Sequence, residues 1–382
     1  MELRKALMRV ARWAGLEGPR SGIRLIPAVY GLPEVTVGGR VVPQQPARVV
    51  ATDGEVGCWV TLSPGEDVPD VVMDARGTLQ AMKAMTGTPV FGLEVTGPRQ
   101  VTVRGGGQMV AVGAWPSEEF PVLPECPTAF WEALGIVQDI HRVTHAALQK
   151  PDPDRPNLAY LHCREAFTEA TDERRVARVR AALLPGRGLV PARLFSSWPA
   201  GRDRYSVWMG TSHQHCFLQV AEELRFARIS PAEKFWDLDG VLPDDKAATT
   251  VLHAESLLKL VEGARKVAER DLVELRFGDG RVAVCGMGGG GEQRSCGSVP
   301  LLGCGEAAVL VLKGRLVTDA LLAFRNRAVR VSWGHAPQPL RFSDDRLTAA
   351  IWPLVPDPPQ EAADARSAAA RHRRGAHPTR RS

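Results

Sequence analysis

The stretch that decides the fold runs from Val71 to Glu125 and reads VVMDARGTLQAMKAMTGTPVFGLEVTGPRQVTVRGGGQMVAVGAWPSEEFPVLPE. The apolar run Val71–Met73 predicts a short strand, and the apolar spacing over Ala75–Met85 predicts a helix directly after it. Alternating apolar residues then predict three further strands, around Phe91–Val95, Val101–Val103 and Met109–Gly113. The stretch ends in a corner at Glu119–Pro124.

The same plan returns twice further along the chain, at Gly188–Pro243 and at Val309–Leu354. A helix is also predicted ahead of each copy, at residues 1–15, Thr128–Val143 and Ala254–Ala268. A unit that recurs at a spacing of about 115 residues predicts repeated domains. Many short strands with only two helices per repeat favour antiparallel sheets and an α+β fold class.

The repeats place three domains at residues 1–124, 125–243 and 244–356, and a chain of 382 residues is long enough to give each a core. Residues 357–382 differ, because they are rich in Ala and Arg and contain almost no large apolar side chains. Such a segment has too little apolar surface to offset its ordering entropy, so we expect a disordered tail.

Composition limits the class of protein. A hydrophobic content of 44% excludes global disorder, and no apolar run of about 18 residues predicts a membrane span. The first residues lack the apolar region of a signal peptide, and the seven cysteines are scattered without a C-x-x-C pair. These features predict a protein of the reducing cytoplasm. The net charge of +5 comes partly from the tail, so cations for a nucleic acid would have to gather on one face of a near-neutral body.

Two patterns resemble ligand sites but predict none. His213-x-His215-Cys216 is the densest metal-ligand pattern, yet no second cluster completes a tetrahedral site. Gly286–Gly291 satisfies G-x-G-x-x-G, but a dinucleotide site needs a helix after the glycines and Glu292–Gly297 predicts a loop. A nucleotide-binding enzyme is therefore a weak alternative, and no catalytic residue, metal or cofactor is predicted.

Several short motifs follow one another in a characteristic order: Ala51–Gly57, Glu119–Pro124, Arg155–Leu158, Thr171–Ala177, Phe235–Pro243 and Ile351–Leu354. With these motifs, residues 1–356 resemble the bacterial β sliding clamp, the β subunit of DNA polymerase III. The resemblance implies a crescent of three domains that dimerises head to tail into a ring, with helices lining the hole and sheets forming the rim. It also implies a non-enzymatic processivity factor that encircles double-stranded DNA and binds short peptide motifs of DNA polymerase and clamp loader.

The chain departs from the family at the motifs that would bind these peptides. The family's Thr-Asp-Gly-His-Arg-Leu turn is Thr171–Val176 here, and its Phe-Pro-Asp-Tyr corner is Phe235–Leu238. The family's Met-Pro-Met-Arg-Leu ending is replaced by Trp352–Pro356, and a tail follows. We therefore expect a reshaped pocket. The alternative function is that of a phage, plasmid or repair-specific paralogue, which binds or sequesters clamp partners without serving the main replicase.

The resemblance implies three sets of site residues. Cations on the helices that would line the hole are expected to contact phosphates without reading sequence, although each could also belong to a solvated helix face. They are Arg9, Arg12, Arg76, Lys83, Arg142, Arg193, Lys259, Lys266 and Arg315. The partner-peptide pocket comprises Leu158, Thr171, Arg174, Arg175, Val176, Trp236, Val241, Leu316, Ile351, Trp352, Pro353 and Leu354. The dimer contact comprises Val110, Val112, Lys266 and Val267, where an ordinary edge strand is the alternative.

Overall fold

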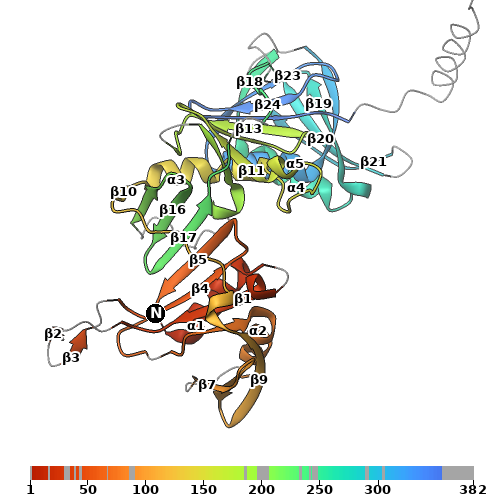
Figure 1. Ribbon diagram of the computed structural model, residues 1–382. Helices are drawn as coiled ribbons and strands as arrows, with labels where there is room; N and C mark the ends of the chain where they lie inside the picture. The colour runs from red at the N-terminus through yellow and green to blue at the C-terminus, as the bar shows by residue number, and fades with distance from the viewer. Residues whose placement is uncertain are drawn as a thin grey trace, which may run out of the picture. The chain divides into compact units, whose positions relative to one another are not determined.

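The computed structural model describes residues 2–15, 18–29, 35–37, 40–42, 45–66, 68–85, 91–184, 187–195, 206–231, 235–240, 242, 248–288, 292–302 and 306–354. The chain divides into two compact units, Met1–Leu238 and Asp239–Ser382 (Figure 1). Strand pairs in both units are antiparallel and the helices are few, which confirms the α+β prediction. The predicted tail lies outside the described residues.

The first half of unit 1 combines helices with a sheet. Its described elements are α1 (Leu3–Val10), β1 (Gly22–Ile26), β2 (Val35–Val37), β3 (Arg40–Val42), β4 (Arg48–Thr52), β5 (Val56–Thr61), β6 (Val71–Asp74), α2 (Ala75–Ala84), β7 (Phe91–Gly97), β8 (Gln100–Gly105) and β9 (Gln108–Trp115). The α1 side chains Leu3, Leu7 and Val10 recur at helical spacing and are buried. Asp74 begins α2 by accepting a hydrogen bond from the Gly77 N–H, as an N-cap residue does.

The second half of unit 1 repeats this plan with a first helix as long as α1 and a one-turn 3-10 helix in the place of α2. Its described elements are β10 (Trp131–Glu132), α3 (Leu134–His141), β11 (Tyr160–Cys163), β12 (Thr168–Thr171), β13 (Arg175–Val179), β14 (Gly188–Pro191), the 3-10 helix η6 (Ala192–Phe195), β15 (Val207–Thr211), β16 (His215–Val220) and β17 (Glu223–Arg228). The helix predicted from Thr128 begins only at Leu134. The prediction was wrong because Trp131 pairs with Met209 of β15, a contact that helical periodicity does not reveal.

The two halves of unit 1 join edge to edge through β17 and β5. The register runs from Glu223 opposite Val60 to Ala227 opposite Val56, so a single sheet of 11 strands crosses the joint. Trp59 and Phe226 pack there with ring centroids 5.5 Å apart. Each large apolar side chain buried at this joint contributes about 1.5–3 kcal/mol.

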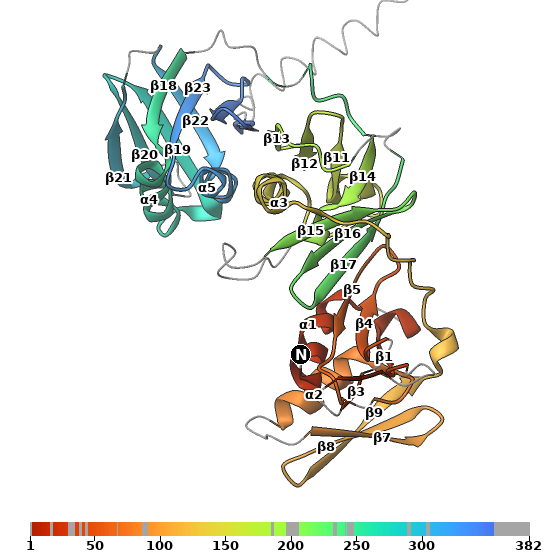
Figure 2. The same ribbon diagram turned by 90° about the vertical axis from the view of Figure 1, so that its left-hand side faces the viewer.

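The described residues of unit 2 form two helices and strands in the orders β18-β23-β24-β25 and β22-β19-β20-β21. Its elements are β18 (Ala248–His253), α4 (Ala254–Arg265), β19 (Leu272–Gly278), β20 (Arg281–Met287), β21 (Gln293–Pro300), β22 (Ala308–Lys313), α5 (Gly314–Ala323), β23 (Ala328–Trp333), β24 (Leu340–Ser343) and β25 (Leu347–Ile351). Helices α4 and α5 lie side by side (Figure 2).

The loop predicted at Glu292–Gly297 is instead the beginning of β21, which pairs with β20. In the described residues 281–288 and 292–300, a strand rather than a helix therefore follows the glycine-rich run. A dinucleotide needs a helix N-terminus at that position to hold its pyrophosphate. This topology does not fit a dinucleotide site at the glycine-rich run.

The repeat predicted from the sequence is visible in the order of elements. A helix followed by three strands, then a strand, a helix and three strands, occurs twice in unit 1 and once in unit 2, with the β2–β3 pair inserted after β1 in the first copy. The second helix of the middle copy is the exception, because only the one-turn η6 is described there. Repetition of one supersecondary plan accounts for the three copies of the motifs.

The cysteines differ from the expectation of reduced thiols in one respect. Cys58, Cys126, Cys163 and Cys216 are free, whereas Cys285 is disulfide-bonded. Complete burial raises the pKa of the Cys216 thiol to about 12, which makes it an unreactive core residue. None of the helices in the described ranges is long and apolar enough to cross a membrane.

Candidate partner-binding and nucleic-acid surfaces

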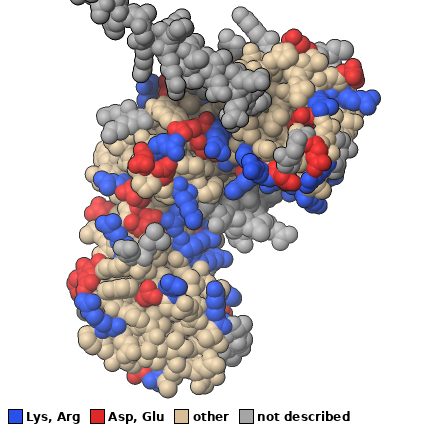
Figure 3. All heavy atoms as spheres, turned by 90° about the vertical axis from the view of Figure 1, so that its right-hand side faces the viewer, with Lys and Arg blue, Asp and Glu red and all other residues tan. Residues whose placement is uncertain are grey.

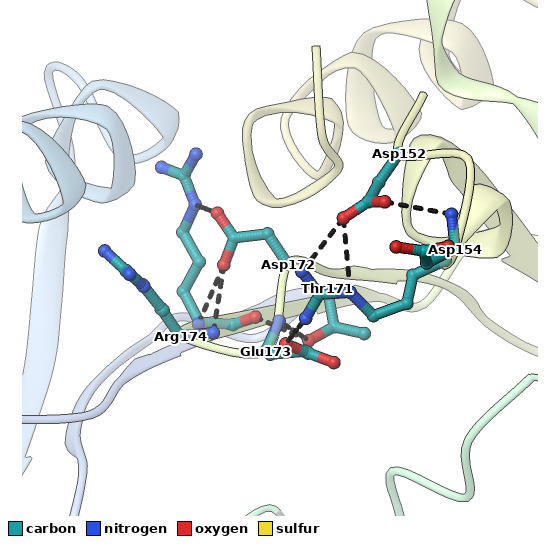
Figure 4. Close-up of polar contacts among 8 residues, drawn as sticks. Asp152, Asp154, Thr171, Asp172, Glu173 and Arg174 are labelled. Atoms are coloured by element: carbon teal, nitrogen blue, oxygen red, sulfur yellow. Dashed lines mark hydrogen bonds and ion pairs between the residues drawn. The ribbon is translucent and has the colours of Figure 1, made fainter. Parts of the chain in front are cut away.

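The turn between β12 and β13 is closed by two side chains (Figure 4). The Thr171 hydroxyl donates to the Arg175 carbonyl at 2.8 Å and accepts from the Glu173 N–H at 3.1 Å. Asp172 Oδ1 accepts from the backbone N–H groups of Arg174 and Arg175, both at 3.1 Å. These bonds satisfy the buried end of the turn and leave the Arg174 side chain exposed.

The same turn occurs at the equivalent position of the first repeat, between β4 and β5, and a related turn lies between β24 and β25 in unit 2. Thr52 donates to the Val56 carbonyl at 2.9 Å, and Asp53 Oδ1 accepts from the Val56 N–H at 2.8 Å. In unit 2, Asp344 Oδ1 accepts from the Leu347 N–H at 2.7 Å. The turns at Thr52 and Thr171 thus share both the threonine and the aspartate bonds, and the β24–β25 turn shares the aspartate bond.

The turn at Thr171 differs from the one at Thr52 by carrying Glu173 where the other carries Gly54. Both residues have positive φ, 71° for Glu173 and 95° for Gly54. A residue with a Cβ loses roughly 1–2 kcal/mol in this conformation. Glu173 therefore has a strained backbone conformation that glycine would adopt without strain. Backbone strain of this kind is common at functional positions.

Glu173 is held by an ion pair with Arg155, which also binds Asp152 (Figure 4). The Arg155 guanidinium lies 2.9 Å from Asp152 Oδ2, and Asp152 Oδ1 accepts from the Asp154 N–H at 3.0 Å. The hydrogen bond from Arg155 lowers the pKa of the Asp152 carboxyl. Charges of both signs therefore border this turn, and Leu158, three residues after Arg155, is buried.

A second polar network lies on the same strands. The buried carboxylate of Glu169 accepts from Arg178 Nε at 2.7 Å and lies 2.8 Å from His162 Nδ1. The His162 ring packs on Phe235, with centroids 4.5 Å apart. Phe235 opens the predicted corner, and the next residue, Trp236, is 45% exposed. The network thus supports the corner that presents Trp236.

The predicted pocket residues of unit 1 fall into two groups. Leu158, Thr171, Arg175 and Val176 are buried, and Arg174 and Trp236 are exposed. Val241 lies outside the described residues. The buried members shape the turn and the exposed members are available to a partner.

The predicted pocket residues of unit 2 lie where its last strand ends. Ile351 ends β25 and is buried, as is Pro353, while Trp352 is partly exposed and Leu354 exposed. The Leu354 N–H donates to the Val311 carbonyl at 2.8 Å, which fixes this segment against β22. Leu316 is half-buried on α5. Unit 2 therefore presents apolar side chains next to an ordered backbone.

Most of the predicted DNA-contacting cations are exposed: Arg9, Arg76, Lys83, Lys259, Lys266 and Arg315. Lys259 Nζ lies 3.9 Å from Glu255 Oε1, and Arg315 Nε lies 3.8 Å from Asp319 Oδ2. Exposed ion pairs of this kind contribute little to stability. On the face drawn in Figure 3, basic side chains form groups with acidic side chains between them. The exposed helix cations can therefore reach an outside anion.

Arg142 differs from the other predicted cations. Its side chain is only 12% exposed and pairs with Asp139 at 3.4 Å at the end of α3. The pairing holds the guanidinium in the protein, so the middle repeat presents Arg193 rather than Arg142 to solvent.

Arg12 and Arg193, which are far apart in the sequence, meet at the joint of the two halves of unit 1. Arg12 binds the buried Glu223 at 3.3 Å, and Arg193 binds Asp53 at 2.6 Å and the Arg12 carbonyl. Both guanidinium groups lie over Trp13, each 5.5 Å from the ring centroid. Sequence reasoning missed Trp13 and Glu223, because 211 positions separate Arg12 from Glu223 and no local pattern links them.

The predicted dimer residues are not equally accessible. Val110 is half-buried on β9, whereas Val112 is only 2% exposed. Val112 faces α2, where a Cβ on Gly77 would lie 3.3 Å from its Cγ1. Lys266 and Val267, just after α4, are exposed. Met109, which the sequence reasoning did not select, is 68% exposed on β9.

Metal ligands are not gathered anywhere in the described ranges, where no group of three or more His, Cys, Asp or Glu could hold an ion. His213 lies in the turn before β16 and His215 lies within that strand.

Comparison with solved structures identifies the fold. The DNA polymerase sliding clamp of Bacillus subtilis matches with a TM-score of 0.71 and 15% identity, over 93% of this chain and 97% of that chain. The DNA polymerase III subunit beta of Pseudomonas aeruginosa matches at 0.67 and 16%, over 92% and 97%. The DNA polymerase III beta chain of Streptococcus pneumoniae TIGR4 matches at 0.69 and 16%, over 92% and 97%. No family model matches the sequence, and no curated protein does. The chain has the sliding-clamp fold.

Proposed function

We propose that this chain is a DNA sliding clamp, a non-enzymatic processivity factor that encircles duplex DNA and tethers DNA polymerase and clamp loader through short peptide motifs. The observation that carries the proposal is the sliding-clamp fold across more than nine tenths of the chain. The exposed cations on α1, α2, α4 and α5 support it, because long cationic side chains attract phosphates without reading sequence.

The pairing of β17 with β5 joins two neighbouring repeats, and the same kind of strand pairing between two copies of the chain would close a ring. This joint pairs the last strand of one repeat with the strand that precedes β6 in its neighbour, which is the third strand after the first helix when the β2–β3 pair is left out. The equivalent strands without such a neighbour in the described residues are β9 in the first repeat and β21 in the third. We propose that β9 of one copy pairs with β21 of a second copy, in a head-to-tail homodimer. Met109, Val110 and Val267 would then lie in the contact.

The peptide site is proposed at two places, the Thr171 turn with Trp236 in unit 1 and the Ile351–Leu354 segment in unit 2. Aromatic and aliphatic side chains beside arginines suit the apolar anchor of a linear motif. In this assignment the unit 1 surface offers Trp236 as an apolar contact and Arg174 for a polar flank, and the unit 2 surface offers Trp352 and Leu354 as apolar contacts.

A clamp paralogue is a second candidate, and Glu173 is the observation that favours it. A strained glutamate bound to Arg155 occupies a turn position that is glycine in the first repeat, which changes the charge of the peptide site. Such a protein would bind or sequester clamp partners without serving the main replicase. Primer extension by the replicative polymerase of the same organism, with its loader, separates the two functions. A processivity clamp lengthens the products, and a sequestering paralogue shortens them in the presence of the main clamp.

Sedimentation tests the ring. The proposal predicts a dimer at micromolar concentration, and a monomer at that concentration would contradict ring closure by β9 and β21. Substitution of exposed Met109 by Arg places a charge in the proposed contact and is expected to shift the population to monomer. Arg104→Gln, a change on the neighbouring strand β8, is the matched control.

A further inference from the structure

Three arginines surround one buried tryptophan in unit 1. Trp13 is 1% exposed, and the guanidinium carbons of Arg12, Arg193 and Arg225 lie 5.5, 5.5 and 5.3 Å from its ring centroid. Cations over an indole ring are attracted by its negative π face. The arrangement brings together residues of the first helical segment, of η6 and of β17.

Two carboxylates fix these arginines. Glu223 is buried and accepts from Arg225 Nε at 2.6 Å while it also binds Arg12. Asp53, from the Thr52 turn, binds Arg193. Three guanidinium groups against two carboxylates leave the cluster with one excess positive charge.

Arg225 is the internal member of the cluster. Its side chain is 1% exposed and donates to the Leu194 carbonyl at 3.2 Å, so it does not reach solvent. Arg12 and Arg193 are the external members, each with 38% of the side chain exposed. A guanidinium carries five N–H donors, so these two groups can hold their protein partners and still donate outward.

We propose that Trp13, Arg225 and Glu223 position Arg12 and Arg193 as one preorganised site for the phosphates of duplex DNA. The inference rests on the proposed sliding-clamp function. A flexible arginine loses side-chain entropy when it binds a phosphate, and an arginine already held against an indole loses less. The joint therefore presents two fixed guanidinium groups, in contrast to Arg9 and Lys83, exposed at the last turns of their helices.

The test measures the dissociation constant of a short linear duplex over a range of NaCl concentrations. The slope of log Kd against log salt falls by about 0.9 for each phosphate that the protein no longer neutralises, so Arg12→Gln with Arg193→Gln is expected to reduce it by up to about 1.8. Arg104→Gln removes an equally charged, exposed and ion-paired arginine of the same unit and is expected to leave the slope unchanged. An unchanged slope in the double variant would overturn the proposal.

Positioning by the indole has its own readout. Trp13→Leu removes the π face and is expected to weaken DNA binding about threefold to tenfold, with a lower salt slope, whereas Trp13→Phe keeps an aromatic face and restores most of both. Wild-type affinity in Trp13→Leu would overturn the positioning role. If Trp13→Leu does not fold, Trp13→Phe and the double arginine variant decide the question.

The remaining outcomes separate this inference from the proposed function. Wild-type protein with no salt-dependent affinity for the duplex would contradict both. A steep wild-type slope that Arg9→Gln with Lys83→Gln reduces, and the double joint variant does not, would contradict the joint site alone. Inorganic phosphate at constant ionic strength is expected to leave duplex binding unchanged, and competition by it would indicate a site for free phosphate.

Discussion

The buried carboxylate of Glu169 gives the sharpest stability prediction. Glu169→Gln keeps the shape of the side chain but removes the charge that faces Arg178 at 2.7 Å and Arg164 at 3.9 Å. Removing one partner of a buried ion pair costs about 3–5 kcal/mol, because the other charge stays buried without compensation. Arg178 is 14% exposed and Arg164 27%, and water at these groups reduces the expected loss to about 2–4 kcal/mol.

Differential scanning calorimetry measures this loss. A loss of 1 kcal/mol lowers Tm by roughly 2–4 °C for a domain of 150–250 residues, so the transition of unit 1 is expected to fall by about 5–15 °C. Glu165→Gln changes an exposed glutamate four positions away and is expected to stay within about 0.5 kcal/mol of wild type. A Glu169→Gln transition within about 1 °C of wild type would refute the electrostatic account of this network.

Three further predictions address the proposed surfaces. Trp352→Ala is expected to abolish binding of a polymerase-derived peptide while Tm changes little, since the side chain is partly exposed; wild-type peptide affinity by calorimetry would refute that placement. Glu173→Gly is expected to change the free energy of unfolding by less than about 1 kcal/mol. Relief of the positive φ stabilises the variant, whereas loss of the exposed Arg155 pair and the conformational entropy of glycine destabilise it. A larger loss of stability in urea unfolding would mean that the ion pair contributes more than the strain costs. Lys259→Gln with Arg315→Gln is expected to lower the salt slope of DNA binding by up to about 1.8, and an unchanged slope would remove α4 and α5 from the DNA surface.

Local patterns predicted much of this fold. The periodicity of Val71–Glu125 predicted β6, α2 and the three strands after it, because most apolar residues there, such as Met73 and Val103, are buried, although Val95 and Met109 are exposed. The helix predicted from Thr128 failed where Trp131 pairs with a strand almost 80 positions later. Cross-strand pairing is a nonlocal contact, and no single-segment period contains it.

The predicted site residues also divide into those that local spacing reveals and those that the sequence pattern does not reveal. Exposed cations on helices, such as Arg9 and Lys259, could be named from helical spacing alone. Burial of Val112 against α2 depends on packing between elements, whereas Arg142 pairs with Asp139 only three positions earlier. In neither case did the apolar or basic pattern distinguish the buried residue from exposed neighbours. The Trp13 cluster was invisible because it assembles from three distant segments.

Topological retention on DNA tests the central claim most directly. The protein is loaded onto a nicked circular plasmid with the loader of the same organism, separated from free protein, and the plasmid is then cut once. A closed ring is expected to stay on the circle at high salt and to leave after linearisation, because it can slide off the ends. Equal retention on circular and linear DNA would contradict a clamp that encircles the duplex.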